Sequence, residues 1–145
     1  MPRPDPALLD PARYPFHCDI EPRFRDLDTN LHINNGVMAT LLEEGRVRFY
    51  RGGGAGGGSV DGIVTTMVVS LAIEFIGESH FPDPLEMQVA VTKVGRTSYE
   101  LIQLVTQRGH AVVFARVTLV CIGAEGPLEM TPGYRESLEA WMLRP

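Results

Sequence analysis

The chain has 145 residues, of which 44% are hydrophobic and 21% are charged, and its formal net charge is −5. This length fits one domain, residues 1–145, with a core of its own, and it excludes two ordinary domains. The acidic balance argues against nucleic acid or an anionic membrane as a partner, because either would favour a basic face.

Residues 1–15 contain five prolines and no apolar run, which predicts an extended arm over the surface and neither a signal peptide nor a membrane anchor. The two cysteines, Cys18 and Cys121, lie in strand-like runs without metal-ligand spacing. We therefore expect reduced core cysteines in a cytoplasmic protein.

The first regular elements are a strand and a long helix. Residues 17–24, HCDIEPRF, alternate apolar and polar side chains, and Pro22 favours an edge strand. Residues 36–50, GVMATLLEEGRVRFY, place apolar side chains three and four apart, which predicts an amphipathic helix of about four turns. Residues 52–59 are mostly glycine and predict a flexible loop; no Gly-Lys-Ser/Thr follows, so a phosphate-binding loop is not indicated.

The rest of the chain is predicted to be mainly sheet. Four alternating runs, within residues 65–79, 84–94, 98–107 and 111–123, are joined by short connections, which favour antiparallel neighbours. A short helix with Thr131 as its cap is predicted near the C-terminus. One helix covers a five-stranded sheet only if the sheet wraps around it, so we predict an α+β hotdog fold whose free edge pairs with a second copy.

The segment DLDTNLHINNG, residues 26–36, carries more hydrogen-bonding groups than a helix cap needs. Asn34 or Asn35 can cap the helix, and amides left free at its first turn can stabilise a developing oxyanion. Asp28 lies just upstream, where it can act as a nucleophile or as the base that activates water. Together these groups suffice to split an ester or thioester.

The same segment, followed by LLEEGRVRFY, resembles the start of the 4-hydroxybenzoyl-CoA thioesterase-like hotdog family and the D-x-N-x-H-x-N-N motif of acyl-carrier-protein thioesterases. The later segments IEFIGES, PLEMQVAVTKVGRTSYEL and VFARVTLVCIG fall in the order of that family. The resemblance implies an acyl-CoA or acyl-carrier-protein thioesterase that works as a homodimer or a dimer of dimers.

The resemblance also implies roles for individual residues. Asp28 matches the catalytic aspartate, and Asn30 and His32 match the amide and imidazole that follow it. Asn35 matches the helix-start residue whose backbone amide polarises the thioester carbonyl, and Glu78 matches a second carboxylate. Ser79 stands where plant acyl-carrier-protein thioesterases have a cysteine. One nucleophile proposed for that family is therefore missing, which favours the carboxylates as the reacting groups.

Substrate contacts are expected at two places. Met38 and Leu42 are predicted to line an apolar tunnel for the acyl chain, whereas Lys93 and Arg96 are cations that can meet the phosphates of coenzyme A. Coenzyme A enters as part of the substrate, and no separate cofactor is expected. No metal is expected either, because the four histidines are scattered along the chain without ligand spacing.

Two alternatives compete with this interpretation. Hotdog hydratases and dehydratases are the nearest enzymes, but the hydratase motif D-x-N-P-x-H separates aspartate and histidine by five residues, whereas Asp28 and His32 are four apart. The segment SHFPDP, residues 79–84, resembles a dehydratase motif but follows a strand rather than preceding the helix, so His80 is interpreted as a loop residue. The other alternative is a hotdog protein that binds acyl-CoA without turning it over.

Overall fold

The structure is a computed structural model that describes residues 3–52 and 65–145. The predicted glycine-rich loop 52–59 therefore lies outside the described residues, except for Gly52, which ends the long helix. No helix in the described ranges has both the length and the apolar character needed to cross a bilayer. The helices and strands are β1 (Phe16–Ile20), α1 (Asn35–Gly52), β2 (Thr65–Phe75), β3 (Leu85–Val94), β4 (Ser98–Gln107), β5 (His110–Gly123), β6 (Gly126–Pro127) and α2 (Pro132–Glu139).

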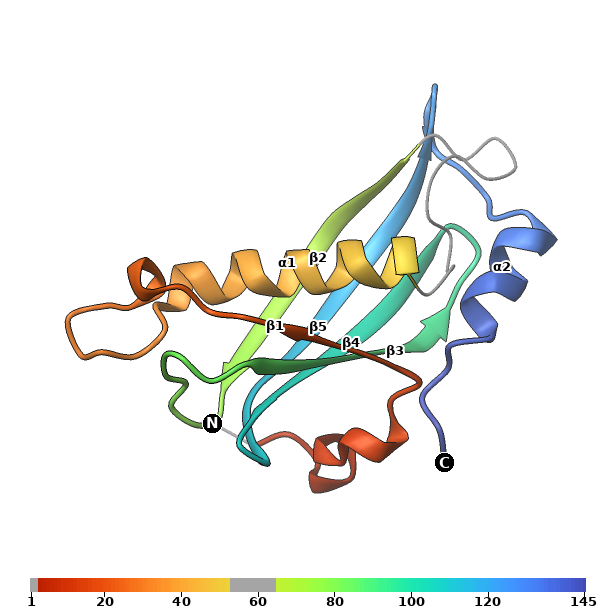
Figure 1. The fold of residues 1–145 in the computed structure, drawn as a ribbon. Coiled ribbons are helices and arrows are strands. Elements are labelled where there is room, and N and C mark those ends of the chain that lie inside the picture. Colours follow the sequence, from red (N-terminus) through yellow and green to blue (C-terminus); the bar gives the residue numbers. More distant parts are fainter. Residues whose placement is uncertain (1–2, 53–64) are drawn as a thin grey trace.

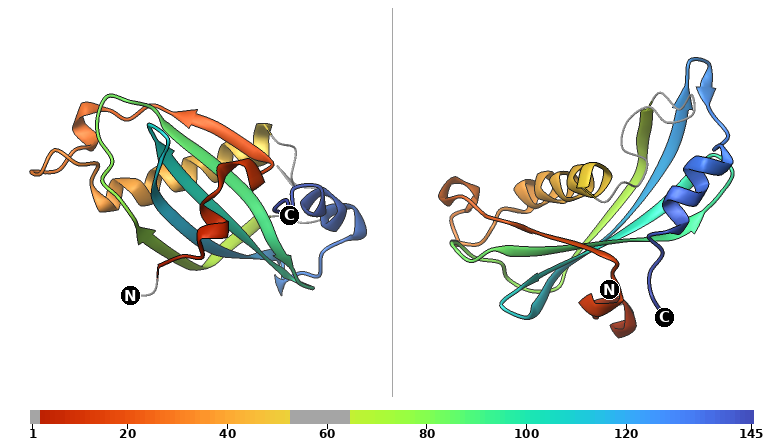
Figure 2. Two further views of the ribbon diagram at one scale, coloured as in Figure 1. Left: turned by 90° about the horizontal axis from the view of Figure 1, so that it is seen from below. Right: turned by 45° about the vertical axis from the view of Figure 1, so that its right-hand side comes forward.

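The strands form one antiparallel sheet in the order β1-β3-β4-β5-β2, and the two-residue strand β6 pairs with β5. The sheet curls around α1, which lies across its concave face (Figure 1, Figure 2). This arrangement confirms the predicted hotdog fold. β1 and β2 are the two ends of the sheet order, so the predicted edge position of the first strand is correct. The strand is shorter than the predicted residues 17–24: β1 ends at Ile20, Pro22 lies beyond it, and Phe24 begins a 3₁₀ turn.

The core lies between α1 and the concave face of the sheet. Met38, Leu42 and Phe49 of α1 are buried there against strands β3, β4 and β5. Gly45 allows this close contact, because a Cβ at this position would lie 2.7 Å from Cγ of Met87 on β3. The apolar stripe of the helix and the missing side chain at position 45 together fix how α1 lies on the sheet.

The N-terminal segment differs from the predicted extended arm. It forms two short 3₁₀ helices, Pro6–Leu9 and Pro11–Arg13, each beginning with a proline after an aspartate whose side chain caps the helix. Tyr14 then packs against a second apolar cluster formed by residues of β3, β4 and β5. The Asp-Pro pairs explain the helical turns, because aspartate accepts the free amide hydrogens and proline already has a helical φ.

β2 is the exposed edge of the sheet. Among the strands of the described ranges it pairs only with β5, and the register shifts between Val68 and Ser70. Large apolar side chains on β2 are 39–53% exposed, namely Met67, Val68, Val69, Leu71 and Phe75. The alternation in the sequence predicted the strand correctly, but in a single chain these side chains remain open to solvent.

Candidate active site

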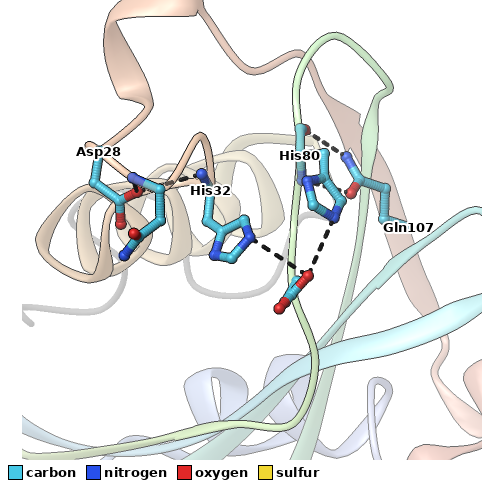
Figure 3. A network of polar contacts seen from close by, with 6 residues as sticks. Asp28, His32, His80 and Gln107 are labelled. Carbon is cyan, nitrogen blue, oxygen red and sulfur yellow. Dashed lines mark hydrogen bonds and ion pairs between the residues drawn. The ribbon is translucent and has the colours of Figure 1, made fainter.

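The loop between β1 and α1 is organised around Asp28. Its Oδ1 accepts hydrogen bonds from the backbone N–H groups of Asn30, at 2.8 Å, and of His32, at 3.3 Å, and its own N–H donates to the His32 carbonyl at 2.9 Å (Figure 3). Leu31, inside this turn, has a φ of 62°. The carboxylate therefore sets the shape of the turn, and Asn30 takes part through its backbone amide.

The start of α1 lies directly after this loop. Oδ1 of Asn34 accepts from the N–H groups of Gly36 and Val37, at 2.8 and 3.4 Å, so Asn34 is the side chain that caps the helix. Nothing in the described part of the chain accepts a hydrogen bond from the backbone N–H of Asn35. That N–H lies in the first turn of a helix of 18 residues, where the helix dipole favours negative charge.

A second loop, between β2 and β3, meets the first one. The Ile33 N–H donates to the Ser79 carbonyl at 2.9 Å, which joins the two backbones. Beside this bond, Nε2 of His32 lies 3.4 Å from Oε2 of Glu78, and Nε2 of His80 lies 3.7 Å from the same oxygen. The two imidazole rings face each other edge to face, with centroids 5.2 Å apart. The imidazole of His32 thus faces Glu78, whereas Asp28 contacts only its backbone.

Gln107, at the end of β4, holds the second loop in place. Its side chain is buried; Oε1 accepts from the His80 N–H at 2.8 Å, and Nε2 donates to the carbonyls of His80 and Asp83 at 2.8 and 2.9 Å (Figure 3). A hollow of about 390 Å³ lies next to it, lined in part by Glu78, His80 and Arg108. Arg108 also forms an ion pair with Asp83.

The first carboxylate of the motif, Asp26, has a structural role. It is buried and accepts hydrogen bonds from the backbone N–H and the guanidinium of Arg23, at 2.7 and 3.1 Å. Burial alone would raise the pKa of Asp26, but these hydrogen bonds and the nearby arginine charges lower it below its ordinary value. The spacing of Arg23 and Asp26, three residues apart, was the only sequence signal for this bond.

The structure brings Asp28, Asn30, His32 and Asn35 into one region with Glu78, and it adds His80 and Gln107, which the sequence did not indicate. His32 and His80 are far apart along the chain, so ligand spacing could not reveal their contact. A buried glutamine in an alternating strand also gives no signal of its own.

The predicted substrate residues lie elsewhere. Met38 and Leu42 are buried in the core. Neither residue lines the hollow beside Glu78, the one beside Asp19 or the one beside Lys93. Lys93 and Arg96 flank the β3–β4 turn, beside α2 and at the end of the molecule opposite the start of α1 (Figure 1, Figure 2). Within one chain, these cations are therefore remote from His32.

Comparisons with known proteins bear on the family and the fold of the chain. A family model described as the thioesterase-like superfamily matches residues 22–141. No curated protein matched the chain significantly. The chain is similar to the solved structure of a thioesterase complexed with coenzyme A and Zn from Thermus thermophilus, with 24% identity, a TM-score of 0.76, and 88% of this chain and 95% of that chain covered.

Two further structures extend the likeness. The PA5185 protein from Pseudomonas aeruginosa has 21% identity and a TM-score of 0.79, with 91% of this chain and 94% of that chain covered. A DHNA-CoA thioesterase from Staphylococcus aureus has 19% identity and a TM-score of 0.70, with 86% and 88% covered. At these identities, the likeness to solved structures supports the fold.

Proposed function

Because the chain belongs to the thioesterase-like superfamily, we propose that it hydrolyses the thioester bond of an acyl-coenzyme A or an acyl-carrier protein. One observation carries this proposal: the Asp28 loop and the Glu78 loop meet at the start of α1, 3.4 Å apart at His32 and Glu78. In the proposed complex, the Asp28 carboxylate, the His32–Glu78 pair and the helix-start amide of Asn35 would act on one carbonyl group.

The reaction needs an attacking oxygen and a donor for the oxyanion. In one route, a water molecule loses its proton to a carboxylate as it attacks the carbonyl carbon, the C–S bond breaks, and the thiol leaves with a proton. In the other route, the Asp28 carboxylate attacks the carbonyl carbon, the C–S bond breaks, and the thiolate leaves and takes a proton; water then hydrolyses the resulting mixed anhydride to the free acid and regenerates the carboxylate. In both, the free Asn35 N–H donates to the oxyanion. In this proposal His32, whose Nε2 lies 3.4 Å from Oε2 of Glu78, transfers the proton.

We also propose that the protein works as a cytoplasmic homodimer, or as a dimer of such dimers, with the active site at the subunit boundary. The exposed apolar side chains of β2 and its unpaired edge favour a second copy of this chain, because an antiparallel β2–β2 contact would bury them and complete the backbone hydrogen bonds. Size-exclusion chromatography with light scattering tests this assembly, and a monomer at micromolar concentration would contradict it.

The substrate carrier and the acyl chain are assigned to separate regions. The Thermus thermophilus structure with coenzyme A supports this carrier for the present chain. Lys93 and Arg96 lie too far from His32 to act in the same protomer, so we assign them to the phosphates of a substrate bound mainly by the partner. Met38 and Leu42 would contact an acyl chain that enters beside α1, which requires the packed core to open there.

The test is a thiol-release assay on a panel of acyl-CoA and acyl-carrier-protein substrates, with the wild type and Asp28→Asn. Asparagine keeps an oxygen that accepts the N–H groups of Asn30 and His32, and it is common in such turns, so the loop is preserved while the negative charge is lost. We expect the rate to fall at least about a hundredfold. Asp19→Asn, an exposed aspartate on β1, is the matched control and should retain the wild-type rate.

The other outcomes separate the alternatives. An unchanged rate in Asp28→Asn would move the chemistry away from this carboxylate. If no thiol is released but the enoyl absorbance of an enoyl-CoA disappears, the protein is a hydratase. Tight binding of an acyl-CoA with neither reaction would identify a binding protein.

A further inference from the structure

Three side chains with metal-ligating atoms converge where the two loops meet. One ligand atom from each of His32, Glu78 and His80 lies within 4.8 Å of the ligand atoms of the other two. Glu78 is central, because its Oε2 lies 3.4 Å from Nε2 of His32 and 3.7 Å from Nε2 of His80. The two histidines come from different loops, so this set exists only in the folded chain.

We infer that His32, Glu78 and His80 bind a divalent transition-metal ion of the Zn²⁺ class. Ligand atoms about 2.0–2.1 Å from a tetrahedral Zn²⁺ lie roughly 3.3–3.4 Å from one another. Two of the three separations, 3.4 and 3.7 Å, are already close to this value. The third, between the histidines, is at most 4.8 Å, so metal binding would require a rotation of these side chains that brings the two nitrogens closer.

The donor set selects the class of metal. Two imidazole nitrogens and one carboxylate oxygen suit Zn²⁺, Co²⁺ and Ni²⁺, whereas Mg²⁺ and Ca²⁺ prefer oxygen ligands. The three side chains are 33%, 67% and 50% exposed, in the order His32, Glu78 and His80. An ion can therefore enter from solvent, and a fourth position stays open to water or to another ligand.

Backbone contacts hold the ligand positions before any metal is bound. Asp28 fixes the backbone of His32, Gln107 fixes that of His80, and the Ile33–Ser79 hydrogen bond joins the two loops. Such support lowers the conformational cost of bringing three ligands together. The hollow beside Glu78 and His80 leaves room for further ligand atoms on that side.

This inference goes beyond the proposed thioesterase activity and does not depend on it. Metal binding is measured on the resting protein without substrate, so a failure of either claim leaves the other testable. The site shares His32 and Glu78 with the proposed catalytic groups, and for that reason activity is not the readout.

The experiment is isothermal titration calorimetry of chelator-treated, tag-free protein with ZnCl₂ at pH 7.5. We expect one Zn²⁺ per chain in the wild type and no measurable binding of Mg²⁺ at the same concentrations. His80→Gln and Glu78→Gln should each weaken Zn²⁺ binding at least tenfold, whereas His17→Gln, on the exposed face of β1, should bind as the wild type does. Equal affinity in wild type and His80→Gln would mean an adventitious ion only and would overturn the site.

A second measurement uses the wild-type protein and so does not depend on whether the variants fold. In the wild-type protein, Zn²⁺ should shift the imidazole NMR signals of His32 and His80 and leave that of His17 unchanged. Shifts at His17 alone, or at no histidine, would contradict the proposed ligands.

Discussion

The two ends of α1 both meet polar side chains, but those side chains differ in burial and in their partners. At the C-terminal end, the buried guanidinium of Arg46 donates to Oε1 of Gln103 at 3.0 Å, and Nε2 of Gln103 donates to the Leu42 carbonyl at 2.9 Å. Three tyrosine hydroxyls form a second set of contacts at this end: the oxygens of Tyr50 and Tyr99 lie 2.5 Å apart, and those of Tyr99 and Tyr134 lie 3.2 Å apart. At the N-terminal end, the side chains of His32, Glu78 and His80 are 33–67% exposed, and the loops that carry them are held largely through backbone hydrogen bonds.

This difference separates a region built for stability from one suited to chemistry. Burial raises the pKa of Tyr99 and of Tyr50 well above the usual range, so both hydroxyls stay neutral at any physiological pH. Burial also lowers the pKa of Arg46, although it remains a cation. In contrast, the side chains of His32 and Glu78 are 33% and 67% exposed and are therefore accessible to water and ligands, as the proposed reaction requires.

The largest expected effect comes from removing the partner of the buried cation. Gln103→Leu leaves the Arg46 guanidinium and the Leu42 carbonyl without that side chain, and we expect the free energy of unfolding to fall by about 3 kcal/mol. Urea unfolding followed by circular dichroism measures this loss. Gln103→Glu keeps an acceptor for Arg46 and should lose clearly less. Equal losses in the two variants would show that the bond to Arg46 does not stabilise the fold.

The second prediction concerns Gln107, which holds the β2–β3 loop near the N-terminal end of α1. Gln107→Leu removes three hydrogen bonds to the loop that carries His80, and we expect a loss of about 2 kcal/mol in the free energy of unfolding. Hydrogen exchange of the His80 amide should become faster at the same time. Unchanged exchange at His80 would mean that the loop is held by other contacts.

Asp26 is buried although it lies near the N-terminal end of α1, where the candidate site is exposed. It therefore tests whether a buried polar group stabilises the fold at this end too. Asp26→Asn removes the charge that Arg23 binds, and we expect a loss of about 1.5 kcal/mol at pH 7. The folded pKa is lowered, so this stabilisation is present above the unfolded pKa of about 3.9 and is lost as the pH falls through the folded value.

The measurement is the difference in unfolding free energy between wild type and Asp26→Asn from pH 7 down to pH 2. The difference should be constant near neutral pH and should shrink below about pH 4. A difference that does not change with pH would assign the loss to packing rather than to charge.

The smallest effect is expected in the tyrosine network. Tyr99→Phe removes a hydroxyl that contacts two others, and we expect a loss of about 1 kcal/mol, because each remaining hydroxyl keeps some hydrogen-bonding capacity. Thermal unfolding monitored by circular dichroism measures it. Tyr14→Phe, which affects a hydroxyl bonded to the Leu8 carbonyl outside this network, serves as the comparison.

The fold was predictable because its signals are local. Alternation in the strands, three-and-four spacing in α1 and short turns all act over a few residues, and together they leave few arrangements for one helix and five strands. The N-terminal 3₁₀ helices were missed because the proline content was interpreted as extended structure, although Asp5 and Asp10 before prolines were the available signal.

The site was only partly predictable. Asp28, His32 and Asn35 lie within one short segment, so the sequence itself places them together. The contact of His80 with Glu78 and His32 depends on how two loops meet, and the bond from Gln107 depends on strand register. Neither the loop contact nor the register can be obtained from spacing along the chain.

Gly45 lies in the second half of α1, directly before Arg46 and beside the Gln103 side chain. Because a methyl group there would come within 3.0 Å of the Met87 side chain and within 3.2 Å of Nε2 of Gln103, the helix rests on the sheet at its minimum separation. A larger residue at position 45 would fit only if the side chains of Met87 and Gln103, or the helix itself, moved away. The close packing of α1 on β3 therefore favours the smallest residue at this position.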